Sequence, residues 1–267
     1  MFLHVFSWLQ KPINIIFGPI DYRFNNNNRT LRIDIQSEHT LVKLGGRSVD
    51  EIIYGNIDLL DLSGGKYLIR VPNYDYYSKL DATIEYSLPN IDNLKTNSRF
   101  TDYLERAIYI APVMGANFYS DRWTDSNRIG TITIGNVSER RELFAAQTKI
   151  PNVQGVLSIE DLKRLYERTQ IMVNVHQTDH HHTFEELRVL PALANGVIVI
   201  SEEVPLINSI PYAESIIWST FEDLPNTIKE VQDNYKFYRD KIFDSELEYK
   251  INDLHKYNIR RLIRKLS

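Results

Sequence analysis

The segment IMVNVHQTDHHHTFEELRVLPALANGVIVISE, residues 171–202, decides the fold class of this chain. Two β-rich apolar runs, 171–176 and 197–201, enclose a stretch with the apolar spacing of a helix. A buried strand, a helix and a second buried strand are typical of a βαβ unit, in which the two strands are parallel. The histidines and glutamates of the segment therefore lie where the first strand ends and the helix begins.

The same alternation extends through the second half of the chain. Further β-rich runs occupy 131–135, 153–156 and 215–218. Three helix starts carry a Ser or Thr followed three residues later by an acid, which is the capping-box pattern: Ser158 with Asp161, Thr183 with Glu186, and Thr220 with Asp223. We predict an α/β fold, with a Rossmann-like domain at 113–267 that ends in closing helices from about Asp233.

The first half is less regular but also contains strand-like segments, namely INIIF, LRIDI, YLIRV, ATIEY and AIYIAP. The turns between them are marked by NNNN at 25–28 and by the glycine pairs at 45–46 and 64–65. We predict a compact Rossmann-like domain at 1–112, with the closing helices packing back across both domains.

Composition excludes several kinds of protein. The chain has 267 residues, 43% hydrophobic and 25% charged, which is ordinary for a globular protein. It contains no cysteine, which excludes a disulfide framework, thiolate catalysis and a cysteine zinc site. The first twelve residues are apolar but too short to span a bilayer and lack an export pattern, so we expect a cytoplasmic protein. No GxGxxG follows a strand, which disfavours an NAD enzyme.

Charge is distributed unevenly. The formal net charge is −4, yet residues 236–267 hold nine Lys/Arg and five Asp/Glu, a local +4 that leaves −8 elsewhere. The last twelve residues, KYNIRRLIRKLS, contain five basic side chains and no acid. Two readings stay open for this tail, a solvated helical end or peripheral contact with an anionic membrane or glycolipid. The overall acidity argues against a nucleic-acid partner.

A first candidate anion site follows the run at 131–135. Gly135 and Asn136 form the turn, Ser138 can cap the next helix, and Arg140 and Arg141 fall in its first turn. Cations at a helix N-terminus oppose the helix dipole, and a bound phosphate would remove that conflict. The alternative is a pair of exposed arginines that form ion pairs with neighbouring glutamates.

A second candidate follows the run at 171–176. The helix start there offers backbone N–H groups, imidazoles and carboxylates, the groups that hold sugar hydroxyls beside a diphosphate. Glu186 has the alternative role of completing a capping box, and the histidines that of a solvated loop. A metal held by His176, Asp179, His180 and His182 is a further alternative, but the spacing matches no metal signature and we expect no metal.

Several of these motifs resemble a known family. NVSERRELF, the segment at 171–205 and IIWSTFEDL resemble the nucleotide-sugar domain of GT-B glycosyltransferases. RIDIQSEHTLVKLGGR, ATIEYSLPNI and YIAP are similar to the acceptor-side domain of a subgroup from bacteria and large viruses, related to glycosyl transferases group 1. The resemblance covers most of residues 30–225. It implies two Rossmann-like domains facing a cleft, and metal-independent transfer of a hexosyl or related group from a nucleoside-diphosphate sugar to a glycan or glycolipid hydroxyl, without a cofactor.

The resemblance and the residues together give a predicted site. The predicted donor-binding residues are Gly135, Asn136, Arg140, Arg141, His176, His182, Thr183, Phe184, Glu186, Arg188 and Glu202. The predicted catalytic residues are Glu38, His39 and Glu185. We expect a retaining enzyme; Glu38 or His39 would supply the base that an inverting enzyme needs.

One position departs from the family pattern. Many related enzymes carry a glutamate just before the Ala-Leu-Ala-x-Gly segment, where this chain has Pro191. Proline there removes a ribose ligand and should kink the helix, and Glu202 is the candidate substitute. The other hypothesis is a non-catalytic nucleotide- or glycan-binding protein that retains the same fold.

Overall fold

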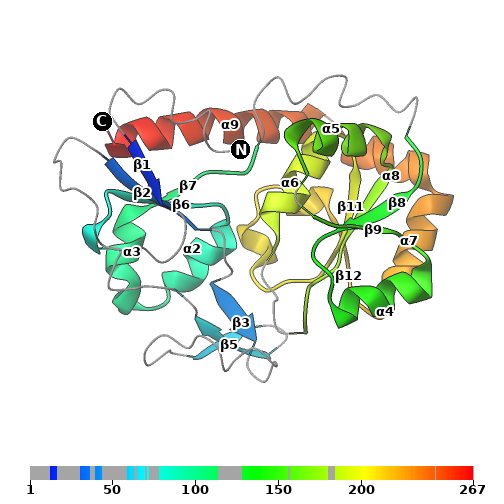
Figure 1. Ribbon diagram of the computed structural model, residues 1–267, viewed down its shortest axis with the longest axis horizontal. Coiled ribbons are helices and arrows are strands. Elements are labelled where there is room, and N and C mark those ends of the chain that lie inside the picture. The colour runs from blue at the N-terminus through cyan, green and yellow to red at the C-terminus, as the bar shows by residue number, and fades with distance from the viewer. Residues whose placement is uncertain are drawn as a thin grey trace. The chain divides into compact units, whose positions relative to one another are not determined.

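The structure is a computed structural model that describes residues 13–16, 31–36, 40–43, 59–62, 65–69, 71, 78–113, 128–155, 157–179, 184–243 and 245–266. These residues fall into two compact units. The N-terminal unit holds described residues up to Ala111 together with Phe184 and 255–266, and the C-terminal unit holds 112–179 and 185–254. The fold is α/β with parallel sheets, as the sequence predicts (Figure 1).

The C-terminal unit is built on a five-stranded parallel sheet. Its strands are β8 (Thr131–Ile134), β9 (Asn152–Val153), β10 (Ile171–Asn174), β11 (Ile198–Glu202) and β12 (Ile217–Ser219). They lie in the order β12-β11-β10-β8-β9. Every residue of β10 and β11 is buried, because helices cover both faces of the sheet and leave no solvated side. All five predicted strands of this half have a counterpart, although β9 shares only Val153 with the run predicted at 153–156 and β12 begins two residues later than predicted.

Five helices cover this sheet. They are α4 (Glu139–Thr148), α5 (Ile159–Arg168), α6 (Glu186–Ala194), α7 (Leu224–Asp233) and α8 (Tyr235–Ile242). Figure 1 shows α5 and α6 on one side of the sheet and α4, α7 and α8 on the other. The layer order is that of a doubly wound fold, in which each strand leads into a helix at its carboxyl end.

The helix starts follow the capping signals in part. The amide of Asp161 donates to the Ser158 hydroxyl at 3.1 Å, and this hydroxyl donates to the Asp161 carboxylate at 2.8 Å, so Ser158 is the predicted cap. The Asp223 amide donates to the Thr220 hydroxyl at 3.3 Å, although α7 begins only at Leu224.

The predicted start, at Thr183, of the helix that follows β10 is wrong. Thr183 lies outside the described residues, and α6 begins at Glu186 with Glu185 as its N-cap residue. The physical reason is tertiary: the Tyr212 hydroxyl donates to the Glu186 carboxylate at 2.9 Å, which draws this acid into the interior. Pro191 lies inside α6, where it removes one backbone hydrogen bond.

The N-terminal unit contains a four-stranded parallel sheet in the order β1-β2-β6-β7. The strands are β1 (Ile13–Ile16), β2 (Leu31–Ile35), β6 (Ala82–Glu85) and β7 (Ala107–Tyr109). The last turns of α9 (Ser245–Leu266) cover one face, where their leucines join a core of isoleucines and one alanine: Ile33, Ile35, Ala82, Ile84, Ile108, Ile110, Leu262 and Leu266.

Smaller elements complete this unit. Strands β3 (Leu41–Lys43), β4 (Leu59–Leu62) and β5 (Gly65–Ile69) form an antiparallel sheet in the order β3-β5-β4. Helices α2 (Leu88–Leu94) and α3 (Thr101–Arg106), with the 3-10 turn η2 (Ser98–Phe100), supply a second apolar cluster. The prediction identified β5 but missed β3 and β4. No helix among the described residues is long and apolar enough to cross a membrane.

Candidate functional site

The order of the strands in the C-terminal unit marks one place for a ligand. The chain leaves β8 toward β9 on one side and leaves β10 toward β11 on the other. The loops after β8 and β10 therefore diverge, and open α/β sheets bind ligands in the crevice at such a switch point, outside the carboxyl ends of the strands. The loop at 135–138 and the loop at 175–179 border this point.

Arg141 bridges the two loops. It lies in the first turn of α4, whose N-cap Ser138 accepts a hydrogen bond from the Arg141 amide at 3.3 Å. Its Nε donates to the Val175 carbonyl at 3.0 Å and its Nη1 to the Asn136 carbonyl at 2.9 Å. The side chain is buried, and its Nη2 has no hydrogen-bond partner among the described residues.

Gly135 makes room for this guanidinium. Its φ of +153° lies in a region that side chains rarely adopt, and a Cβ added there would lie 2.7 Å from Cζ of Arg141. The absence of a side chain at 135 is thus a condition for the position of Arg141.

The electrostatics around Arg141 favour an anion. Burial and, to a smaller extent, the nearby charge of Arg188 lower the pKa of Arg141 to about 10, against the opposing effect of Glu185 and Glu202. The guanidinium remains protonated at neutral pH but is incompletely compensated. A ligand with negative charge at Nη2 would satisfy both the orphaned donor and the buried cation.

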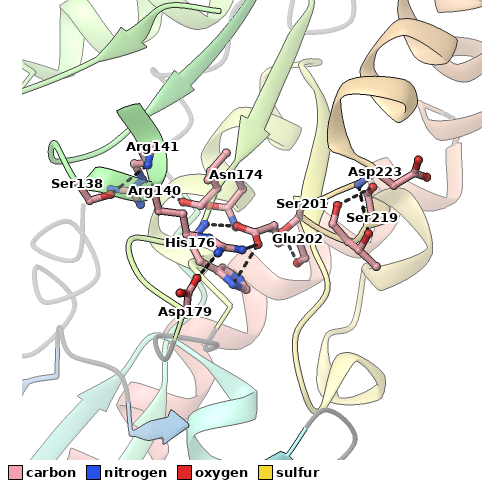
Figure 2. A network of polar contacts seen from close by, with 12 residues as sticks. Ser138, Arg140, Arg141, Asn174, His176, Asp179, Ser201, Glu202, Ser219 and Asp223 are labelled. Carbon is pink, nitrogen blue, oxygen red and sulfur yellow. Dashed lines mark hydrogen bonds and ion pairs between the residues drawn. The ribbon is translucent and has the colours of Figure 1, made fainter. Parts of the chain in front are cut away.

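Arg140 is held from several sides. Its Nη2 donates to Glu202 Oε1 at 2.5 Å, its Nη1 forms an ion pair with the exposed carboxylate of Asp179, and its guanidinium lies 3.8 Å from the ring centroid of Phe221. The Nε atom is buried without a hydrogen-bond partner among the described residues. Figure 2 shows Arg140, His176, Asp179 and Glu202 converging.

Glu202, at the end of β11, organises this group. Its Oε2 accepts a hydrogen bond from the His176 amide at 2.6 Å, and its Oε1 lies 3.8 Å from His176 Nδ1. Glu202 and His176 are both buried. Protein donors occupy both carboxylate oxygens of Glu202, and its predicted contact with a ribose stays a prediction.

A second chain of contacts runs along the carboxyl ends of β10 and β11. Arg188 Nη1 donates to Asn174 Oδ1 at 3.1 Å, and Asn174 Nδ2 donates to the Ser201 hydroxyl at 3.0 Å. Arg188 Nη2 lies 3.7 Å from Glu185 Oε2. Arg140 and Arg188 thus have carboxylate partners at this sheet edge, whereas Arg141 between them bonds backbone carbonyls.

The structure brings most of the predicted donor-binding residues of this unit together with Glu185, a predicted catalytic residue. Those at the switch point or beside it are Gly135, Asn136, Arg140, Arg141, His176, Glu185, Arg188 and Glu202. Phe184 and Glu186 are fully buried, and Glu186 accepts a hydrogen bond from Tyr212, so their predicted contact with a donor stays a prediction. Glu38, His39, His182 and Thr183 lie outside the described residues.

The sequence reasoning missed several members of the network. Asn174, Ser201 and Phe221 had no predicted role, and Asp179 entered only as a possible metal ligand. Asn174 was detectable in principle, because it is a polar residue at the end of an apolar strand. Within the described part of the chain no three His, Asp or Glu residues are grouped to hold a metal, and His180 and His182 lie outside that part.

Comparisons with known proteins give distant matches. No family model matches the chain. It is 29% identical over 133 residues to an uncharacterised protein of Acanthamoeba polyphaga mimivirus, a match that spans 48% of this chain and 40% of that protein.

Two solved structures are also similar. A glycosyltransferase from Rickettsia africae matches with a TM-score of 0.48 and 12% identity, over 89% of this chain and 70% of that one. The GtfA/B complex matches with a TM-score of 0.39 and 11% identity, over 89% of this chain and 51% of that one. Neither likeness is close enough to indicate a function.

Proposed function

We propose that this chain is a glycosyltransferase that moves a hexosyl or related group from a nucleoside-diphosphate sugar to a hydroxyl of a glycan or glycolipid, without a metal ion. The observation that carries the proposal is the buried Arg141 guanidinium at the β8/β10 switch point, with Nη2 lacking a partner among the described residues. The motifs that resemble GT-B enzymes coincide with this point.

The cationic groups of the site suit the negative charge that such a reaction develops. Cleavage of the anomeric bond leaves negative charge on the departing diphosphate, and preorganised donors that meet this charge lower the barrier. Arg141, the N-terminus of the ten-residue helix α4 and Arg140 present cationic or N–H groups at one sheet edge. Two arginines and a helix N-terminus can serve in place of a divalent cation.

In this scheme we assign Asp179 the role of an ion-pair partner that a phosphate displaces from Arg140. Its carboxylate is 83% exposed and pairs with Arg140, whereas Glu202 on the same guanidinium is buried. A phosphate can therefore replace Asp179 at Arg140 without breaking the buried contact. Asp179→Asn should then tighten nucleoside-diphosphate binding or leave it unchanged, while Glu202→Gln should weaken it.

Other residues are proposed to bind the sugar and the acceptor. Glu185, at the N-cap of α6 and near Arg188, is proposed to bond sugar hydroxyls. Glu38 and His39 are proposed to face the acceptor, and a retaining outcome would leave neither of them essential as a base. Near wild-type turnover of both Glu38→Gln and His39→Ala would exclude a base role for these residues.

The deciding experiment measures binding and turnover separately. Calorimetry with nucleoside diphosphates tests the anion site, and hydrolysis or transfer from a panel of nucleoside-diphosphate sugars tests catalysis. Binding and turnover that are both lost in Arg141→Ala support a transferase. Binding without turnover of any donor favours the non-catalytic alternative, and no binding of any nucleoside diphosphate refutes the proposal.

A further inference from the structure

The C-terminal part of helix α9 has two different faces. One face is buried in the N-terminal unit through Asn258, Leu262 and Leu266. The Asn258 side chain donates to the Ala111 carbonyl at 2.8 Å and accepts from the Ala111 amide at 2.9 Å. This face is fully used by packing, so it leaves the opposite face as the surface available for recognition.

The opposite face carries a continuous basic and apolar stripe. It consists of Lys256, Tyr257, Arg260, Ile263 and Arg264, which we call the basic stripe, and all five side chains are exposed. Lys256, Arg260 and Arg264 are spaced four residues apart, and Tyr257 and Ile263 each lie three residues from Arg260, so the five share one helix face. Tyr257 is 42% exposed and Ile263 37%.

The charges of the basic stripe lack acidic neighbours on the same segment. Residues 254–266 contain no Asp or Glu. Like charges four residues apart repel each other, and the helix dipole offsets this only in the last turn. The guanidinium of Arg260 lies 6.0 Å from the centroid of the Tyr257 ring, and that of Arg261 lies 5.5 Å from it, so cations cluster around an exposed aromatic ring.

We propose that the basic stripe docks the protein on an anionic lipid surface, with Tyr257 and Ile263 entering the headgroup boundary. Charge complementarity indicates the binding partner. The chain has a net charge of −4, so a local positive face on it attracts a negatively charged surface such as an anionic bilayer. The exposed tyrosine and isoleucine favour lipid over nucleic acid, since apolar side chains gain by leaving water in a bilayer interface. The inference does not depend on the proposed function.

Sedimentation with vesicles tests the proposal on the 267-residue chain. Binding should be strong with phosphatidylglycerol in phosphatidylcholine and weak with phosphatidylcholine alone. It should fade as salt rises from ~0.1 to ~1 M, over which the screening length falls from about 10 to about 3 Å. Equal binding to both vesicle types, or binding to neither, would overturn the proposal.

Variants test whether the basic stripe is responsible for vesicle binding. Lys256→Gln/Arg260→Gln/Arg264→Gln should lower partitioning about a hundredfold, since each basic side chain near an anionic bilayer contributes roughly fivefold. The matched control is Arg164→Gln/Lys229→Gln/Lys241→Gln, which removes three exposed cations from α5, α7 and α8 and should keep wild-type binding. Equal losses in the two variants would contradict the proposal.

A second pair of measurements separates lipid from nucleic acid. Tyr257→Ser/Ile263→Ser should reduce vesicle binding severalfold and keep the helix, because neither residue belongs to the buried face. Circular dichroism and thermal melting check that each variant is folded. Fluorescence anisotropy with labelled RNA and DNA should show no tight binding. The contrary outcome is tight binding to RNA or DNA that the triple Gln variant abolishes, together with vesicle binding that this variant keeps. That result would make the basic stripe a nucleic-acid surface instead.

Discussion

Gly135→Ala tests the candidate anion site, because the nearest atoms to the added methyl group all belong to the guanidinium of Arg141. The added Cβ would lie 2.7 Å from Arg141 Cζ, so one of the two must move. The guanidinium is the far end of a flexible side chain, and its displacement costs less than displacement of the backbone. We therefore expect the fold to survive and the contacts from Arg141 to Asn136 and Val175 to break.

The size of the effect follows from those contacts. A hydrogen bond to a charged group contributes about 1.5–3 kcal/mol, so loss of one such contact to a bound phosphate should lower affinity about ten- to a hundredfold. The left-handed φ at 135 adds a strain of about 1–3 kcal/mol to the folded state. In a unit of this size that strain lowers Tm by roughly 2–4 °C per kcal/mol.

Gly155→Ala is the matched control. Gly155 also has a positive φ, +88°, but an added Cβ would meet nothing within 4 Å. Both variants should lose thermal stability, while only Gly135→Ala should lose affinity for nucleoside diphosphates in calorimetry. Wild-type affinity in Gly135→Ala, or an equal loss in Gly155→Ala, would refute the role assigned to Arg141.

Three further predictions concern other parts of the chain. Burial raises the pKa of Glu85 to about 8 from 4.5, so the folded state holds this proton more tightly than the unfolded state. The resulting stability is complete below pH ~4.5 and is lost as pH rises through ~8, on the order of 5 kcal/mol at 1.36 kcal/mol per unit, and Glu85→Gln should flatten this slope in urea unfolding. Excess EDTA should leave donor turnover unchanged, whereas activity lost in EDTA and restored by zinc or manganese would point to His176 and its neighbours as ligands. Glu185→Gln should reduce turnover of the donor sugar but keep nucleoside-diphosphate affinity, and an equal loss of both would place this residue at the diphosphate.

Local patterns predicted the elements of the fold well. The strands at 131–134, 171–174 and 198–202 follow from runs of buried β-rich residues. Ser158 caps its helix as the capping-box spacing predicts, and Ser138 caps the helix after the first of these strands, as expected. Each of these features depends on residues a few positions apart. The parallel arrangement follows because such strands alternate with helices, which also places the polar loops at one edge of the sheet.

The network at that edge depends on contacts that no local pattern contains. Arg140 reaches Glu202, 62 positions away, and Arg141 reaches the carbonyl of Val175, 34 positions away. The same holds for Glu186, for which the local pattern predicted a capping or donor-binding role and which the Tyr212 hydroxyl, 26 positions away, holds in the interior. The sequence by itself therefore determined which side chains arrive at the carboxyl ends of the strands, because strand and helix periodicity are local. Only the tertiary structure decided which of them pair with one another and which buried atoms, such as Nη2 of Arg141, lack a hydrogen-bond partner among the described residues, because strand order and burial arise from packing between distant segments.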